Sequence, residues 1–280
     1  MKSKLHDRTM EQLQEQYVIE KELANKLRLA SREERRSLYS SVYDELFRRV
    51  PHHPQLTRQS SPKDSQVYVV SQIKALKPFL DKEYTFLEVG PGDCALSLEM
   101  TKLVAQVYAV DVSNEITKNL SSPQNFKLVL SDGSSVPVPQ NSVNLIYSNQ
   151  LMEHIHPDDA IEQLQNLYNA LAPGGIYFCV TPNRLNGPHD ISRYFDTIAT
   201  GFHLKEYTVS ELSALFKKAG FSKIMVRVGA RGWHINMPIF LSVLSEKLLL
   251  LLPYKIRKLI ASSLPARKLL GICLIGVKNI

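Results

Sequence analysis

The stretch FLEVGPGDCALSLEM, residues 86–100, combines acidic residues and glycines at a spacing that could hold a ligand. Gly90 and Gly92 allow the backbone to approach a ligand where a Cβ atom would clash. Glu88 lies two residues before the first of these glycines, and Asp111 lies 19 residues after the second, at the end of another apolar run. A carboxylate at that spacing accepts hydrogen bonds from both ribose hydroxyls. The stretch therefore predicts a site for a nucleotide-like ligand.

Two classes of ligand fit this glycine turn. The letters GPGDCA match G-x-G-x-x-A, a pattern typical of sites for nicotinamide or flavin dinucleotides. Glu88 would repel the anionic pyrophosphate of a dinucleotide, whereas it would attract the sulfonium and ammonium groups of S-adenosylmethionine. Asp132 ends a third apolar run and could accept a hydrogen bond from an adenine amino group, and Asn149 ends a fourth run. Together the four run ends favour S-adenosylmethionine as the cofactor.

Short apolar runs alternate with helical patterns from residue 84 onward. Helices are predicted at 93–104, 157–173 and 208–220, with Gly174 and Gly175 marking the end of the second and Thr208 or Ser210 capping the third. Strands are predicted at 84–89, 106–112, 125–132, 142–149, 176–182, 221–229 and 269–278. Seven strands with helices between them predict a three-layer α/β fold around a mostly parallel sheet, which binds ligands at the carboxyl ends of its strands.

The N-terminal region has a different pattern. Residues 9–50 place apolar residues at roughly helical spacing and predict two or three amphipathic helices. Prolines in VPHHPQ, residues 50–55, end these helices. We therefore divide the chain into an N-terminal helical extension at 1–62, which acts as a lid or brace, and an α/β domain at 63–280 that contains an amphipathic helical insertion at 230–268.

Several stretches resemble the ordered motifs of class I S-adenosylmethionine-dependent methyltransferases: FLEVGPGDC, VYAVDVS, LSDGSSVPVPQNSVNLIYSN, LAPGGIYFCVTPN and the later AGF. The resemblance covers roughly residues 80–230 and returns at the final strand. It implies a Rossmann-like seven-stranded sheet of order 3-2-1-4-5-7-6, with the last strand antiparallel. It also implies a cofactor site made of Glu88, Gly90 and Gly92 at the methionine and ribose, Asp111 and Val112 at the ribose and adenine, Asp132 with Gly133 at the adenine amine, and Asn149 at the amino-acid end. Cys94 departs from the family by standing where many members have a third glycine.

Candidate catalytic residues lie in two further stretches. The 27 residues from 182 to 208 form a long loop, which in a compact domain is usually functional or disordered. They place the titratable groups His189, Asp190 and His203 at the mouth of the site. His154 follows the fourth strand and could act as a base or as a structural brace. We predict both histidines as catalytic residues, because an oxygen nucleophile benefits from a base.

The stretch around Gln150, Glu153 and His154 bears on metal binding. It resembles the E-x-x-E-H with which some class I methyltransferases, among them quinone-pathway O-methyltransferases and small-RNA end methyltransferases, bind a divalent ion. Gln150 replaces the first glutamate, and a neutral amide is a poorer ligand for a hard cation than a carboxylate. We therefore predict no metal, so that activity should survive EDTA.

Charge restricts the methyl acceptor. The chain has a net charge of +7, but residues 63–239 carry 15 Lys or Arg against 17 Asp or Glu and show no basic stripe beside the strand ends. This pattern disfavours an RNA methyltransferase, which remains the alternative enzyme. We predict O-methylation of a small-molecule, glycan or lipid-linked acceptor. A non-catalytic S-adenosylmethionine-binding scaffold is disfavoured because all the cofactor positions are intact.

The insertion predicts a contact with a partner. Residues 240–280 carry 7 Lys or Arg against 1 Asp or Glu, and segment 234–268 mixes leucine-rich runs with the basic residues Lys247, Lys255, Arg257, Lys258, Arg267 and Lys268. This segment predicts either peripheral contact with an anionic membrane or a helical pair that packs on the body or forms a homodimer. The N-terminus has no apolar signal and the three cysteines are far apart, which predicts a cytoplasmic protein with peripheral membrane contact as an open alternative.

Overall fold

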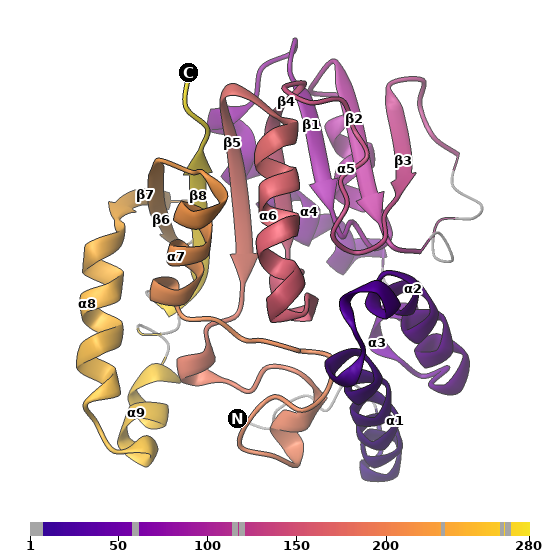
Figure 1. Cartoon of the computed structure of the whole chain (residues 1–280), viewed down its shortest axis with the longest axis vertical. Helices are drawn as coiled ribbons and strands as arrows, with labels where there is room; N and C mark the ends of the chain where they lie inside the picture. The colour runs from indigo at the N-terminus through magenta and orange to yellow at the C-terminus, as the bar shows by residue number, and fades with distance from the viewer. Residues whose placement is uncertain are drawn as a thin grey trace.

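The computed structural model describes residues 8–57, 62–113, 117, 121–230, 233–263, 266 and 270–280. Within these residues the centre is an eight-stranded sheet of order β3-β2-β1-β4-β5-β8-β6-β7 (Figure 1). The strands are β1 Thr85–Val89, β2 Gln106–Asp111, β3 Phe126–Leu130, β4 Val143–Asn149, β5 Leu171–Thr181, β6 Lys223–Ala230, β7 Trp233–Pro238 and β8 Ile272–Val277. Strands β1 to β5 run parallel, and β8 is antiparallel to both β5 and β6.

The predicted strand order is confirmed, with one addition. All seven predicted strands are present, and the last of them, β8, lies antiparallel between β5 and β6. The addition is β7, which pairs antiparallel with β6 in the segment that we expected to be helical throughout. It covers backbone groups that would otherwise leave β6 as an unpaired edge. Helices α8 Ile239–Leu250 and α9 Tyr254–Ala261 follow it.

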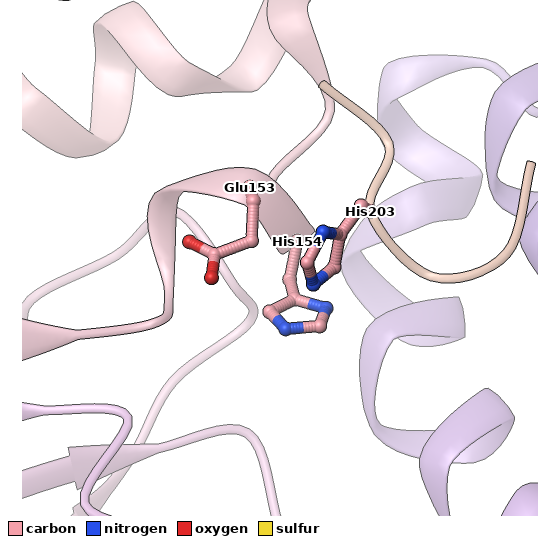
Figure 2. A group of neighbouring side chains, drawn as sticks. All are labelled: Glu153, His154 and His203. Carbon is pink, nitrogen blue, oxygen red and sulfur yellow. The ribbon is translucent and has the colours of Figure 1, made fainter. Parts of the chain in front are cut away.

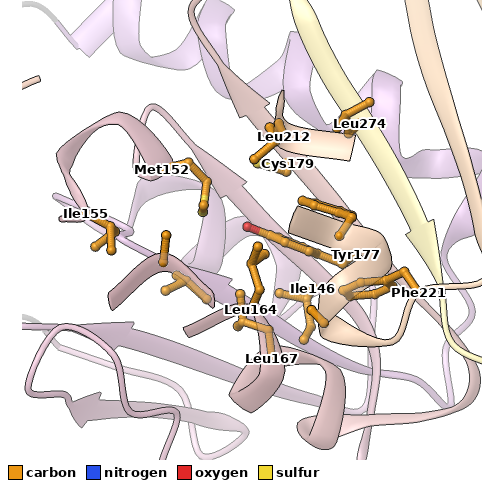
Figure 3. Close-up of a cluster of buried hydrophobic side chains, with 14 of the residues drawn as sticks. Ile146, Met152, Ile155, Leu164, Leu167, Tyr177, Cys179, Leu212, Phe221 and Leu274 are labelled. Atoms are coloured by element: carbon orange, nitrogen blue, oxygen red, sulfur yellow. The ribbon is translucent and has the colours of Figure 1, made fainter. Parts of the chain in front are cut away.

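Helices cover both faces of the sheet and complete three layers. On one face lie α6 Pro157–Ala170 and α7 Val209–Ala219, and on the other lie α4 Pro62–Leu76 and α5 Ala95–Met100. Figure 3 shows the first of these cores, in which Leu164 and Leu167 of α6 and Leu212 of α7 pack with Tyr177 of β5. A second core joins apolar side chains of α4 and α5 to the opposite face. The expected α/β sandwich is therefore the fold of the chain.

The start of β5 differs from the sequence-based expectation. Helix α6 ends at Ala170 and β5 begins at the next residue, so Gly174 and Gly175 lie inside the strand. A Cβ atom at Gly175 would lie 3.0 Å from the carbonyl oxygen of Val143, where the β4–β5 register is irregular. The interpretation of the two glycines as a helix end is wrong, because close backbone packing explains Gly175. Thr208 is confirmed as the cap of α7.

Two long helices make up most of the N-terminal extension, as predicted. Helices α1 Met10–Leu29 and α2 Arg32–Arg49 each begin with a capping box, at Thr9 and Ser31, and the short α3 Pro54–Thr57 follows. They lie at the carboxyl ends of the parallel strands (Figure 1). Arg35 of α2 donates two hydrogen bonds, each of 2.7 Å, to the carboxylate of Asp159 in α6, and both residues are buried. The extension is thus tied to the body as a brace.

The C-terminal helices lie along the β6–β7 side of the sheet (Figure 1). Leu249 of α8 and Ala261 of α9 pack with Leu185 and Leu270 in a small cluster of their own. Among the helices that the structure describes, none has both the length and the hydropathy needed to span a bilayer. Two of the predicted basic residues, Arg267 and Lys268, lie outside the described residues.

Candidate active site

A glycine turn follows β1 at the carboxyl edge of the sheet. Gly90 and Gly92 have φ angles of +68° and +58°, a left-handed backbone that other residues rarely adopt. A Cβ atom at Gly92 would meet no heavy atom of the described residues within 4 Å, so this glycine opens onto free space. Cys94 caps α5 and is fully buried, and this burial raises the pKa of its thiol to about 12. Cys94 therefore packs the turn rather than acting as a nucleophile.

Asp111 ends β2 beside this turn. Its Oδ1 accepts hydrogen bonds from the N–H of Val112 at 2.7 Å and from the N–H of Ser113 at 3.3 Å. Burial nevertheless raises the pKa of the Asp111 carboxyl above its ordinary value, although the backbone donors lower it. A carboxylate buried in this way at the edge of a cavity gains most from a ligand that donates hydrogen bonds, as a ribose diol does.

A cavity of about 140 Å³, here called the cofactor cavity, lies over the glycine turn. Sequence-predicted residues that line it are Gly90, Gly92, Asp111, Val112, Gly133 and His154. The sequence did not predict its opposite wall, which consists of Tyr39, Tyr43 and Phe47 of α2. Contact across the cavity is close, because a Cβ atom at Gly133 would lie 2.3 Å from the ring of Tyr39. The N-terminal extension therefore forms part of the predicted cofactor site.

Two predicted cofactor residues are set back from the cofactor cavity. Glu88 is buried and accepts a hydrogen bond from Ser97, and desolvation raises the pKa of its carboxyl to about 8. Asp132 accepts hydrogen bonds through Oδ1 from the N–H groups of Ser134 and Ser135, which hold the turn after β3. Neither residue is among those that line the cavity. Their predicted roles toward the cofactor remain predictions.

A larger cavity of about 1030 Å³, here called the acceptor cavity, lies between α4 and the ends of β4 and β5. Asn149 and His189, both predicted site residues, line it, and Asn149 donates a hydrogen bond of 2.6 Å to the hydroxyl of Tyr68. Gln150 lines both this cavity and the cofactor cavity. The chain thus brings Asn149 and His189 to a space that borders the cofactor cavity.

Glu153, His154 and His203 form a cluster at the end of β4 (Figure 2). One ligating atom of each lies within 4.8 Å of the others. Desolvation raises the pKa of the Glu153 carboxyl to about 7 and lowers the pKa of His154 to about 3, so His154 is a neutral imidazole at pH 7. The sequence placed His203 at the mouth of the site, but it gave no sign that this residue would meet His154, which lies 49 positions earlier in the chain.

The loop after β5 carries a second set of polar contacts. His203 Nδ1 lies 2.7 Å from Oε1 of Glu206, and the same oxygen accepts a hydrogen bond of 2.7 Å from the N–H of His189. A third cavity of about 250 Å³ is lined by His154, His189, His203 and Asp190, and by Glu20 of α1. The two predicted catalytic histidines therefore share one cavity wall with His203, which the sequence placed at the mouth of the site but not among the catalytic residues.

This geometry agrees with a comparison against protein families. Residues 56–226, more than half of the chain, match the family model described as a methyltransferase domain. The chain belongs to this methyltransferase family.

The chain is similar to proteins that are described as probable S-adenosylmethionine-dependent methyltransferases. It is 32% identical over 88 residues to a probable S-adenosylmethionine-dependent methyltransferase of Mycolicibacterium smegmatis, a match that covers 31% of this chain and 32% of that protein. It is 28% identical over 137 residues to one of Mycobacterium tuberculosis, which covers 48% of this chain and 47% of that protein. The match thus spans a third to a half of the curated relatives.

Solved structures share the fold at low identity. A chain of the complex between the Haloferax volcanii Trm112 methyltransferase activator and a putative methyltransferase has a TM-score of 0.56 at 15% identity, covering 80% of this chain and 94% of that one. A Thermotoga maritima methyltransferase, described as a possible histamine N-methyltransferase, has a TM-score of 0.51 at 14% identity, covering 77% and 91%. These likenesses show the class I fold alone.

The cofactor cavity fits S-adenosylmethionine in chemistry but is narrow. The open space over Gly92 and the buried carboxylate of Asp111 suit the ribose, and the backbone of the turn can approach the methionine part. Its volume of about 140 Å³ is below the roughly 300 Å³ at which small-molecule pockets begin. Tyr39, Tyr43 and Phe47 of α2 form the wall that makes this cavity narrow.

Proposed function

We propose that this methyltransferase transfers a methyl group from S-adenosylmethionine to a hydroxyl oxygen of a lipid-linked, sugar-containing acceptor. The observation that carries the proposal is the acceptor cavity, which borders the cofactor cavity at Gln150 and extends to Arg227 of β6 and His234 of β7. Asn186, on the rim of the acceptor cavity, belongs to the short helix η5 Arg184–Asn186, and Leu185 of that helix packs against Ala261 of α9. An acceptor could therefore extend from the reaction centre to that surface.

The lining of the acceptor cavity is both apolar and polar. Tyr147, Phe178 and Val180 offer apolar surface, and Arg227 offers a guanidinium that is 9% exposed. Arg227 Nη1 donates to Asn236, whereas its buried Nε has no hydrogen-bond partner among the described residues. A buried donor without a partner favours an anionic group on the ligand, such as a phosphate. This combination suits a lipid-linked acceptor better than a neutral small molecule.

The C-terminal hairpin of α8 and α9 could bring the enzyme to its acceptor. Large apolar side chains are more than 40% exposed on both helices: Phe240, Leu241, Leu244, Leu248, Leu250, Tyr254, Ile256, Leu259 and Ile260. Lys247, Lys255, Arg257 and Lys258 lie among them in the sequence. An apolar face with a cationic rim is typical of helices that lie in the interface of an anionic bilayer.

The proposed reaction is an in-line displacement in which the acceptor oxygen forms a bond to the methyl carbon. The bond between carbon and sulfur breaks, and its electron pair stays on the sulfur of S-adenosylhomocysteine. His189 lines the acceptor cavity, and its Nε2–H donates to the carbonyl oxygen of Asn183. We assign His189 to take the hydroxyl proton and His154 to a place beside the cofactor.

Methyl-label transfer tests the function. The full chain is incubated with S-adenosylmethionine labelled in its methyl group and with separated lipids, glycans and RNA. We expect label in a lipid-linked, sugar-containing fraction, as a methyl ether. Label that enters RNA would contradict the proposal, and cofactor binding without any transfer would favour a scaffold.

Liposome sedimentation tests the membrane contact. We expect binding to anionic vesicles, weak binding to neutral ones and release at high salt, because each basic residue near an anionic surface contributes about 1 kcal/mol and salt screens the attraction. Replacing Lys255, Arg257 and Lys258 with Glu should abolish binding while the affinity for S-adenosylmethionine is unchanged. Equal sedimentation with both kinds of vesicle, or with neither, would favour packing or a homodimer.

A further inference from the structure

The cluster of Glu153, His154 and His203 has an arrangement that a methyl-transfer reaction alone does not require. The side chains come from two segments, since Glu153 and His154 follow β4 and His203 lies in the loop after β5 (Figure 2). Glu153 is fully buried and His203 is 8% exposed. A carboxylate and two imidazoles gathered in one buried place need either mutual neutralisation or a cation.

Each of the two imidazoles is oriented by a hydrogen bond at its Nδ1 atom. His154 Nδ1 lies 3.0 Å from the carbonyl oxygen of Phe202, which can only accept, so Nδ1 carries the proton and Nε2 carries the lone pair. His203 Nδ1 donates in the same way to Glu206 at 2.7 Å. Histidines that ligate metals almost always donate their other ring N–H to a carbonyl or carboxylate. Both rings of this cluster have that arrangement.

Glu153 supplies an oxygen without a partner. Its Oε2 accepts a hydrogen bond of 2.7 Å from the hydroxyl of Thr181, whereas its Oε1 is buried with no hydrogen-bond partner among the described residues. An unsatisfied carboxylate oxygen in the interior is costly, and a native structure needs a reason for it. A bound cation would provide that reason.

We propose that Glu153, His154 and His203 bind one divalent transition-metal ion. Two imidazole nitrogens and one carboxylate oxygen suit Zn²⁺ and similar ions better than Mg²⁺, which prefers oxygen ligands. The ligating atoms lie within 4.8 Å of one another, and tetrahedral coordination at about 2.1 Å needs them about 3.4 Å apart. Small side-chain rotations would therefore bring the ligating atoms to the spacing that a tetrahedral ion needs. The sequence-based expectation of no metal counted only Glu153 and His154, and the fold adds the third ligand.

The position of the cluster indicates what the ion would do, a point that rests on the proposed function. His154 lines both the cofactor cavity and the third cavity, and His203 and His189 line the third cavity. A bound ion would make an acceptor hydroxyl beside it more acidic. His189 would take the proton of that hydroxyl as its oxygen bonds to the methyl carbon, and the sulfur would retain the electrons of the broken bond.

Metal titration of the full chain tests the site. The protein is first stripped with EDTA and then titrated with Zn²⁺ and with Co²⁺ in a calorimeter. We expect one ion per chain, and for Co²⁺ the visible absorption of a four- or five-coordinate ion with nitrogen ligands. No binding, or binding of Mg²⁺ in preference to both ions, would overturn the proposal and leave the cluster as a buried ion-pair network around His203.

Matched variants identify the ligands. Glu153→Gln and His203→Asn should each weaken Co²⁺ binding by more than about 100-fold and remove its absorption. His156→Asn is the control, because this histidine caps α6 outside the cluster and asparagine can cap it too. Thermal melting in EDTA shows whether each variant is folded without metal. Unchanged binding in both folded ligand variants would contradict the assignment.

Glu206→Gln tests the positioning of His203. Glutamine keeps an oxygen that can accept from His203 Nδ1 but loses the charge, so we expect metal affinity to fall by about 10- to 100-fold, as is typical for second-layer partners. Affinity equal to that of the unaltered protein would show that Glu206 does not orient a ligand. Methyl transfer is measured separately with and without EDTA, so that loss of metal binding and loss of the proposed reaction are distinguishable.

Discussion

The carboxyl edge of the sheet is assembled in two different ways. At the ends of β1 and β2, Gly90, Gly92 and Asp111 lie within 22 residues of one another and face one cavity through local backbone turns. At the ends of β4 and β5, Glu153 and His154 meet His203 only because a long loop folds back over the strand ends. The first region is a local motif, and the second is a product of tertiary packing.

The difference teaches where sequence patterns are informative. A strand followed by a glycine turn restricts its own backbone, so the spacing of Gly90 and Asp111 carries structural information without the rest of the chain. The loop that holds His203 has no such constraint and is positioned by contacts with other elements. Arg28 of α1, for example, donates hydrogen bonds to the carbonyl oxygens of Thr200 and Gly201.

Helix α2 connects the two regions. Removing the Arg35–Asp159 ion pair that holds α2 to α6 should therefore have the largest effect. Asp159→Ala removes both short hydrogen bonds from the buried Arg35 to a carboxylate and leaves it the carbonyl oxygen of Ala30 and the exposed Asp158 at 3.9 Å. The change should lower the free energy of unfolding by about 3–5 kcal/mol. Chemical denaturation measures this change. Asp158→Ala is the matched control: this neighbour is largely exposed in the same helical turn and should cost less than about 1 kcal/mol. A small loss for Asp159→Ala would show that α2 is held by other contacts.

Removing the carboxylate of Asp111 tests whether this residue binds the ribose of the cofactor. Asp111→Ala should weaken S-adenosylmethionine binding by about 1.5–3 kcal/mol, or about 10- to 150-fold, because hydrogen bonds to a charged group are lost. Calorimetry measures the affinity. Asp93→Ala removes an exposed carboxylate from the same turn and should leave the affinity nearly unchanged. Wild-type affinity in the Asp111 variant would remove its assignment to the ribose.

A third test concerns the pH dependence of stability through Glu88. Burial raises the pKa of this carboxyl from 4.5 to about 8, so the folded protein binds a proton that the unfolded chain has lost. Stability from this group is present below pH 4.5 and is lost as pH rises toward 8, by at most about 1.4 kcal/mol per pH unit. Glu88→Gln should flatten the fall of the cofactor-free melting temperature between pH 5 and 8. An unaltered slope would show that Glu88 does not titrate in this range.

Much of the fold could be predicted from the sequence. Alternating apolar runs and helical patterns located all seven predicted strands, and the resemblance to class I methyltransferases implied their order, both of which the structure confirms. Strand β7 was missed because its six residues run directly into an apolar helix and their pairing with β6 is a tertiary contact. Gly174 and Gly175 were misread because a glycine pair marks close backbone packing as readily as a helix end.

The sequence by itself determined the glycine turn, the acidic strand ends and hence the cofactor class, because these depend on backbone geometry within short segments. The tertiary structure alone decided that Tyr39, Tyr43 and Phe47 close the cofactor cavity and that His203 joins Glu153 and His154. The physical reason is that side chains far apart in the chain meet only when burial of apolar surface brings their elements together. No local pattern encodes such a meeting, since each segment alone is compatible with many partners.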